Sequence, residues 1–300
     1  MDSILSPQDN AGIDTEYQEN YVASNEADTT GHGSRVLQFI QNFAPEAVYN
    51  FFRVVATNKK FKPSNLLKAL DSIRNKDIDL VNISAGKYHK NCSGKCRLSS
   101  AVDELVREDT VIVAGAGNTK EGKSLGVFCP AKSSNSIAVG MSESICEASP
   151  SNQSMPIGVD SLESRPPGAY YAKWQSNSQY YPDETYCGYN GCSPMHSCEN
   201  NRRIKYWDGN VEWKDTIPEI VAPGHLPIVD THKTEAELEP GTSYSAATVT
   251  GGLACVLSEI FPTQITPQRI KRTVEASSED LDCGIVGKFD MKDLKRNLSE

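Results

Sequence analysis

Three polar residues stand where apolar segments of the sequence meet turns. His32 lies between two glycines in "GHGSRV", and Ser243 lies in "PGTSYSAA", after a turn and at the start of a predicted helix. Asn118 ends the apolar run "VIVAGAGN". A serine nucleophile needs a base to take its proton, and a histidine base needs a carboxylate to hold its tautomer. Because α/β folds place their sites in loops at the sheet edge, these positions favour serine-based chemistry.

Each residue also has a purely structural interpretation. Ser243 would cap the helix that it starts, and the local sequence alone favours this role. The side-chain amide of Asn118 would tie down its own turn. The glycines around His32 would let backbone, as well as a ligand, come close to the imidazole. Only the combination of the three residues makes the chemical interpretation the stronger one.

The rest of the chain alternates short β-branched runs with amphipathic segments, which is typical of a parallel sheet flanked by helices. We therefore expect an α/β fold of three layers, with a mostly parallel central sheet and helices on both faces. Strands are predicted at 48–55, 80–84, 111–118, 136–140 and 218–224. Helices are predicted at 63–75, capped by Ser64 or Asn65; at 96–109, burying Leu98, Val102, Leu105 and Val106; at 241–261; and at 266–277, capped by Thr266.

One segment breaks this alternation. From about Cys146 to Lys214 the sequence is rich in Ser, Pro, Asn, Tyr and Cys and shows little periodicity. Within it, "YWDGNVEW" is typical of a hairpin with its turn at Asp208-Gly209. Since no second periodic core is visible, we expect residues 1–300 to form one domain with a large insertion at about 146–214.

The charge and hydropathy of the chain exclude several kinds of partner. The formal net charge is −9, whereas binding to nucleic acid or anionic lipid needs basic clusters. No apolar run approaches the ~20 residues that span a bilayer, so we expect no membrane partner. The polar, acidic start matches neither a signal peptide nor a transit peptide.

Nine cysteines are present, and five of them fall in two groups, Cys92/Cys96 and Cys187/Cys192/Cys198. For the second group a loop disulfide, free thiols and a metal site, with His196 as the one histidine candidate, all stay open. The paired spacing usual in zinc sites is missing, so no metal ligands are assigned, and the other histidines, His89 among them, are expected to be exposed. The cysteine content weakly favours an exported protein.

Four motifs, in their order along the chain, resemble those of the subtilisin-like serine peptidases, the subtilase family. "MDS" is similar to the family's aspartate segment, and "DTTGHGSRV" to its histidine segment. "VIVAGAGN" is similar to the strand and turn that carry an asparagine, and "PGTSYSAATVTG" to the segment that carries the nucleophile. "LVNISAG", "CPAKSSNSIAVG" and "PEIVAPG" extend the resemblance over about residues 2–290.

The resemblance implies a role for each residue. Ser243 would be the nucleophile, His32 the general base and then acid, and Asp2 the carboxylate that orients the imidazole. The Asn118 amide and the backbone N–H of Ser243 would stabilise the oxyanion. Asp14 is an alternative to Asp2, but it lies only eighteen residues before His32, against thirty for Asp2. The backbone of an extended substrate would pair with the exposed strand edges of two stretches. These are Ser84-Ala85-Gly86 and Ala114-Gly115-Ala116-Gly117.

The sequence also departs from the family. Ser34 replaces the usual threonine after the His-Gly pair, and Ala247 stands where the family carries proline. Only Met1 precedes Asp2, which predicts that the chain lacks the first strand of the catalytic domain.

The resemblance implies a serine endopeptidase that acts on peptides or proteins, works as a monomer and requires no cofactor. Calcium is frequent in the family, but no loop matches a calcium site closely enough to name ligands. Two other interpretations stay open. One is an inactive or weakly active relative that binds extended peptides, and the other is an esterase or amidase that uses the same triad.

Overall fold

The computed structural model describes residues 15–22, 31–56, 61–89, 92–118, 127–142, 185–188, 191–194, 218–224, 241–260, 265–280 and 287–300. Their main element is a six-stranded sheet in the order β3-β4-β5-β8-β10-β9. All neighbours pair in parallel except β9 and β10, which are antiparallel. The strands are β3 (Leu80–Ile83), β4 (Val111–Gly115), β5 (Ile137–Ser142), β8 (Ile220–Pro223), β9 (Glu279–Asp280) and β10 (Gly287–Lys288).

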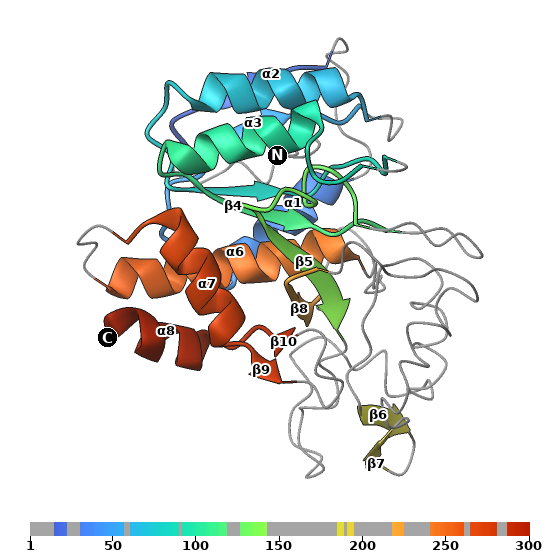
Figure 1. The fold of residues 1–300 in the computed structure, drawn as a ribbon, viewed down its shortest axis with the longest axis vertical. Helices are drawn as coiled ribbons and strands as arrows, with labels where there is room; N and C mark the ends of the chain where they lie inside the picture. The colour runs from blue at the N-terminus through green and yellow to red at the C-terminus, as the bar shows by residue number, and fades with distance from the viewer. Residues whose placement is uncertain are drawn as a thin grey trace.

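Helices cover both faces of this sheet, as Figure 1 shows. Successive side chains of a strand point to opposite faces, so Ile112 and Ala114 of β4 pack on one side and Val111 and Val113 on the other. The first side is covered by α2 (Pro63–Ile73) and α3 (Arg97–Arg107), and the second by α6 (Thr242–Glu259), α7 (Pro267–Ala276) and α8 (Met291–Ser299). The three-layer α/β fold predicted from the sequence is thereby confirmed.

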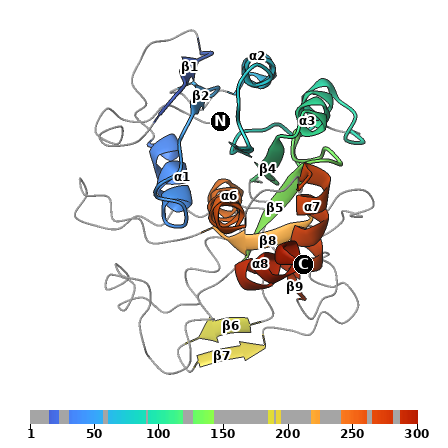
Figure 2. The same ribbon diagram turned by 90° about the vertical axis from the view of Figure 1, so that its left-hand side faces the viewer.

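Helix α6 is the centre of the second layer. Every residue from Thr242 to Leu253 is buried, because the helix lies against β3, β4, β5 and β8 and also against α1 (His32–Gln41). Figure 2 views α6 nearly along its axis, with α1 on one side and α8 on the other. Phe39 of α1 stacks on Tyr244 of α6 with ring centroids 4.9 Å apart. At Gly251 a Cβ atom would lie 2.6 Å from the carbonyl oxygen of Ile40 in α1, so a small residue at this position allows the two helices to pack closely.

The segment predicted as a strand at 48–55 behaves differently from the others. Its strand, β2, is limited to Phe51–Arg53 and pairs in parallel with β1 (Gln18–Asn20), in a sheet of its own. A cavity of about 680 Å³ lies between this pair and the six-stranded sheet. Its lining includes residues of β2, β3, α1 and α6. In the described part of the chain, the single predicted sheet is thus two sheets.

The helix ends agree only in part with the predictions. Thr266 caps α7 by accepting a hydrogen bond from the N–H of Arg269, and α3 buries all four predicted residues, so both are confirmed. The predicted cap of α2 is wrong, because the helix begins after Lys62 with Pro63 in its first turn, ahead of Ser64 and Asn65. Proline suits that position because it has no N–H to leave unpaired.

Little of the predicted insertion is described. Strands β6 (Thr185–Gly188) and β7 (Gly191–Pro194) form an antiparallel hairpin in which Cys187 and Cys192 are register partners. The hairpin predicted around Asp208-Gly209, His196 and Cys198 all lie outside the described residues. None of the helices described has the length and apolar character needed to cross a bilayer.

Candidate active site

Ser243 lies in the first turn of α6, but it is not the cap of that helix. The N-cap is Gly241, which has no side chain that could cap the helix. The Ser243 hydroxyl instead reaches the carbonyl oxygen of Ser84 at 3.5 Å, and the Ser84 hydroxyl donates to the Ser243 carbonyl at 3.1 Å. The capping interpretation is therefore wrong, and the structure brings the end of β3 directly against the predicted nucleophile.

Asn118 does not tie down its own turn either. Its Oδ1 accepts hydrogen bonds from the N–H of Thr242, at 3.2 Å, and from the Thr242 hydroxyl, at 3.1 Å. The same hydroxyl accepts from the N–H of Gly117 at 3.1 Å. These bonds fasten the turn after β4 to the start of α6. They also fix which way the amide faces, because a backbone N–H must meet the oxygen of the amide.

Two nitrogen atoms border the same space next to Gly241. The position that a Cβ atom would take at Gly241 lies 3.4 Å from Nδ2 of Asn118 and 3.9 Å from the backbone nitrogen of Ser243. Asn118 is exposed to solvent, whereas Gly241 and Ser243 are buried. Converging N–H groups at a helix N-terminus favour a negatively charged oxygen.

His32 is the first residue of α1 and follows Gly31, whose φ is 61°. Its imidazole lies 5.4 Å from the ring of Tyr244, the residue after Ser243. The Tyr244 hydroxyl accepts a hydrogen bond from Nε of Arg35 at 3.1 Å, which holds that ring between two side chains of α1. The packing of α1 on α6 thus brings His32 to the end of α6 where Ser243 lies.

The carboxylate of the predicted set is not placed. Both Asp2 and its alternative Asp14 lie outside the described residues, so the choice between them stays a prediction.

The two predicted substrate-binding stretches differ in accessibility. Ser84, Ala85 and Gly86 are all half-buried and continue from β3, which is an edge strand of its sheet. In the second stretch, Ala114 and Ala116 have no exposed surface. Strand β4 is also hydrogen-bonded on both sides, to β3 and β5, so the predicted free edge at Ala114 is wrong.

Gly117 is the residue of the second stretch that the geometry requires to be glycine. Its φ is 108°, and a Cβ atom there would lie 2.4 Å from the ring of Phe128. The Phe128 ring therefore covers this turn, immediately before Asn118.

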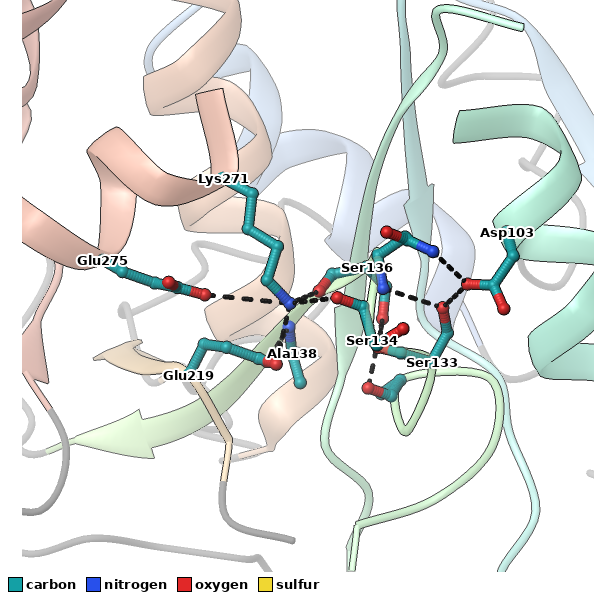
Figure 3. Close-up of polar contacts among 10 residues, drawn as sticks. Asp103, Ser133, Ser134, Ser136, Ala138, Glu219, Lys271 and Glu275 are labelled. Carbon is teal, nitrogen blue, oxygen red and sulfur yellow. Dashed lines mark hydrogen bonds and ion pairs between the residues drawn. The ribbon is translucent and has the colours of Figure 1, made fainter. Parts of the chain in front are cut away.

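The segment that follows Phe128 is anchored on both sides at Ser133–Ser136, as Figure 3 shows. On the α3 side, Asp103 accepts hydrogen bonds from the Ser133 hydroxyl and, at 2.8 Å, from the side chain of Asn135. On the α7 side, Nζ of Lys271 donates to the carbonyl oxygens of Ser134 and Ser136, at 2.9 and 2.6 Å. The wall of the site next to Gly117 is thus held by helices of both outer layers.

Lys271 also pairs with a half-buried carboxylate. Its Nζ lies 2.9 Å from Oε1 of Glu219, whose Oε2 accepts from the N–H of Ala138 at 2.7 Å (Figure 3). Burial raises the pKa of Glu219, and the charge and hydrogen bond of Lys271 offset this only in part. The ion pair joins α7 to the strands β5 and β8.

We expect Lys271→Met to lower the free energy of unfolding by about 3 kcal/mol at neutral pH, because it leaves the half-buried Glu219 carboxylate without its cation. A carboxyl group with a raised folded-state pKa stabilises the protein fully below its unfolded-state pKa and loses that effect as the pH rises through the folded value. Removing Lys271 raises that pKa further. The deficit, measured by urea unfolding, should therefore shrink as the pH falls to about 4.

The exposed Lys68 of α2 provides the matched control, since Lys68→Met should change stability little. A Lys271→Met deficit that stays constant between neutral and acid pH would show that the Glu219 charge is not its origin.

Four residues with no assigned role in the predicted site also come together. The ligand atoms of His89, Cys92, Cys96 and Cys129 all lie within 4.8 Å of one another. His89 is half-buried, so the prediction that it is exposed is wrong. Burial raises the pKa of Cys129. Burial also opposes ionisation of Cys96, but hydrogen bonds with Ser99, Cys129 and His89 outweigh it and lower the pKa of Cys96 to about 6.

Comparisons with known proteins identify relatives of this chain. Residues 3–293 match the model of the subtilase family, Peptidase_S8. The minor extracellular protease Epr of Bacillus subtilis (strain 168) is 31% identical over 149 residues, which are 46% of this chain and 22% of that protein. The chain therefore spans about a fifth of the length of this relative.

Two solved structures share the fold. The crystal structure of a lanthipeptide protease superposes with a TM-score of 0.60 at 19% identity, covering 99% of this chain and 86% of that one. The protease domain of PatA superposes with a TM-score of 0.56 at 17% identity, covering 96% of this chain and 88% of that one.

Proposed function

Because the chain belongs to the subtilase family of serine peptidases, we propose that it hydrolyses peptide bonds through an acyl-enzyme formed on Ser243. The observation that carries this proposal is that β3, α1 and the turn after β4 all meet the start of α6. Thr242 holds Asn118 at the start of α6, Ser84 at the end of β3 contacts Ser243, and α1 brings His32 alongside Tyr244.

In this proposal the Ser243 hydroxyl attacks the carbonyl carbon of the scissile bond while His32 takes its proton. The C–N bond then breaks, the proton passes from His32 to the leaving amine, and water later releases the acid by the same route. The side chain of Asp2 orients the imidazole. The Asn118 amide and the Ser243 N–H, which border one space next to Gly241, donate to the oxyanion. The positive end of the α6 dipole favours the same charge.

The substrate is proposed to be an extended peptide or protein segment. Its backbone would pair with Ser84-Ala85-Gly86, which follow an edge strand and remain partly accessible. Side chains of the substrate would meet the backbone of Gly115 and Gly117 and the ring of Phe128 that covers Gly117. Export of the chain and a monomeric state belong to the proposal as well. Export is supported by the extracellular relative and by the cysteine content.

Covalent labelling with a fluorophosphonate tests the nucleophile. The reagent forms a P–O bond to Ser243 and loses fluoride, while the hydroxyl proton passes to His32. We expect labelling of the wild-type chain at Ser243, identified by peptide mapping, and no labelling of Ser243→Ala. Hydrolysis of a mixed peptide library should disappear in the same variant.

Ser245 provides the control, because it is fully buried one position beyond Tyr244 in the same helix. Ser245→Ala should label as the wild type does. Labelling that survives Ser243→Ala would remove Ser243 as the nucleophile, and labelling with turnover of esters but not of peptides would favour an esterase.

A further inference from the structure

A cluster of metal-ligand side chains lies directly behind the wall of the site formed by Phe128. His89, Cys92 and Cys96 are half-buried and Cys129 is fully buried. All four ligand atoms lie within 4.8 Å of one another, and the sulfur atoms of Cys92 and Cys129 are 3.4 Å apart. None of the peptidase steps proposed above uses any of these residues.

Backbone contacts hold the three segments of the cluster together. The N–H of Cys92 donates to the carbonyl oxygen of His89 at 3.2 Å, which brings these two residues together. Cys96 is the N-cap residue of α3. Cys129 is joined to Lys87 by a pair of backbone hydrogen bonds of 2.9 and 3.0 Å. The cluster thus draws on the loop after β3, the start of α3 and the segment after Phe128.

The loop between Cys92 and Cys96 packs closely against the segment that follows Cys129. Gly94 has a φ of 76°, and a Cβ atom there would lie 2.4 Å from the carbonyl oxygen of Lys132. Only glycine allows this close approach, which keeps Cys92 and Cys96 next to Cys129.

We propose that His89, Cys92, Cys96 and Cys129 bind one zinc ion in a closed, structural site. Three thiolates and one imidazole are a usual tetrahedral ligand set for structural zinc. A Zn–S distance of about 2.3 Å gives sulfur atoms about 3.8 Å apart, so the cluster needs shifts of about 1 Å to close around the ion. The thiol protons leave to solvent as the ion binds. Four protein ligands leave no position for substrate.

A disulfide between Cys92 and Cys129 is the competing chemistry. It requires the two sulfur atoms to approach from 3.4 Å to about 2.0 Å and needs an oxidant. It also leaves His89 and Cys96 without a role, although both converge on the same point. Zinc binding uses all four side chains, and it would protect the thiols from oxidation in an exported protein.

The position of the site gives the ion a mechanical role. The Lys87–Cys129 bridge directly follows Gly86, and Cys129 directly follows Phe128, which covers Gly117. An ion bound here would therefore fasten the two walls of the proposed substrate site to each other and to α3. This consequence rests on the proposed function, but binding of zinc does not.

The zinc content of the purified chain tests the proposal independently of peptidase activity. The chain is produced with zinc in the medium, purified under reducing conditions without chelator, and analysed by mass spectrometry of the metal. We expect one zinc ion per wild-type chain and none in Cys96→Ser. Cys92→Ser and His89→Ala, which alter half-buried loop residues and should keep the fold by circular dichroism, should also lose it.

Two control variants assign the site. Cys255→Ser, on the outer part of α6, and Cys187→Ser, in the β6–β7 hairpin, should both keep the ion. Replacement of zinc by cobalt should add thiolate charge-transfer absorption that disappears in Cys96→Ser. A zinc chelator should lower the melting temperature of the wild type but not that of Cys92→Ser. Zinc that persists in Cys96→Ser, or a Cys92–Cys129 disulfide in non-reduced peptide maps of protein purified without reductant, would overturn the proposal.

Discussion

Replacing His32 by alanine is expected to lower kcat by about 10⁶-fold, the scale on which loss of the base acts in a subtilisin-type site. The physical reason is that the Ser243 hydroxyl keeps its proton at neutral pH unless a neighbouring base accepts it. His32 is the one histidine that the structure places beside the start of α6, among the residues that it describes. Steady-state hydrolysis of a fluorogenic peptide measures the loss.

The fold should survive this change, because His32 is half-buried at the first position of α1 and the apolar contacts of that helix come from later residues. Tyr244→Phe serves as the control, since it keeps the ring against which His32 lies and removes only the hydroxyl that accepts from Arg35. It should retain most of the activity. The wild type should also lose activity at acid pH as its base is protonated, and this limb should be absent from the residual rate of His32→Ala. Wild-type activity that persists unchanged at acid pH would contradict His32 as the base.

The general architecture could be predicted because it depends on local patterns. β-branched runs such as 111–115 are buried on both faces, and the amphipathic period of 97–107 is that of a helix with one buried side. Thr266 followed by Pro267 specifies a helix start by itself. These features need no knowledge of what lies elsewhere in the chain.

The predictions that failed depend on partners far away in sequence. The capping role that the local sequence favours for Ser243 considers only its immediate neighbours, but the start of that helix is bound by Asn118, which lies 124 positions before Thr242. The free edge expected at Ala114 is occupied by β3 and β5, which local patterns cannot reveal.

The Cys/His cluster could be predicted from the sequence only in part. No ligand was assigned from the sequence because no CxxC pair is present, but two residues separate His89 from Cys92 and three separate Cys92 from Cys96, and structural metal sites accept both spacings. Cys129 has no such neighbour in sequence. It joins the others only because the Lys87–Cys129 bridge folds one segment onto the other, so the fourth ligand required the structure.

Replacing Asn118 by alanine is expected to lower kcat by about 10²–10³-fold and to leave KM nearly unchanged. An oxyanion exists only as the transition state forms, so a donor directed at it contributes to kcat rather than to ground-state binding. The position of Nδ2, beside Gly241 and near the Ser243 nitrogen, is the geometric basis of this expectation. Initial rates over a range of peptide concentrations separate the two constants.

Asn118→Ala also removes the oxygen that accepts hydrogen bonds from Thr242. A second variant must therefore separate the role of Asn118 as a donor to the oxyanion from its role in holding the start of α6. Asn118→Asp keeps an Oδ1 that can accept from the Thr242 N–H and hydroxyl, but it loses the N–H₂ donor and adds negative charge next to the oxyanion. If Asn118 acts as the donor, Asn118→Asp must be at least as slow as Asn118→Ala. If Asn118 only anchors the start of α6, Asn118→Asp must recover activity and Thr242→Val must be as damaging as Asn118→Ala. A lower kcat in both Asn118 variants, together with a smaller loss in Thr242→Val, would therefore assign to Asn118 the stabilisation of charge rather than of structure.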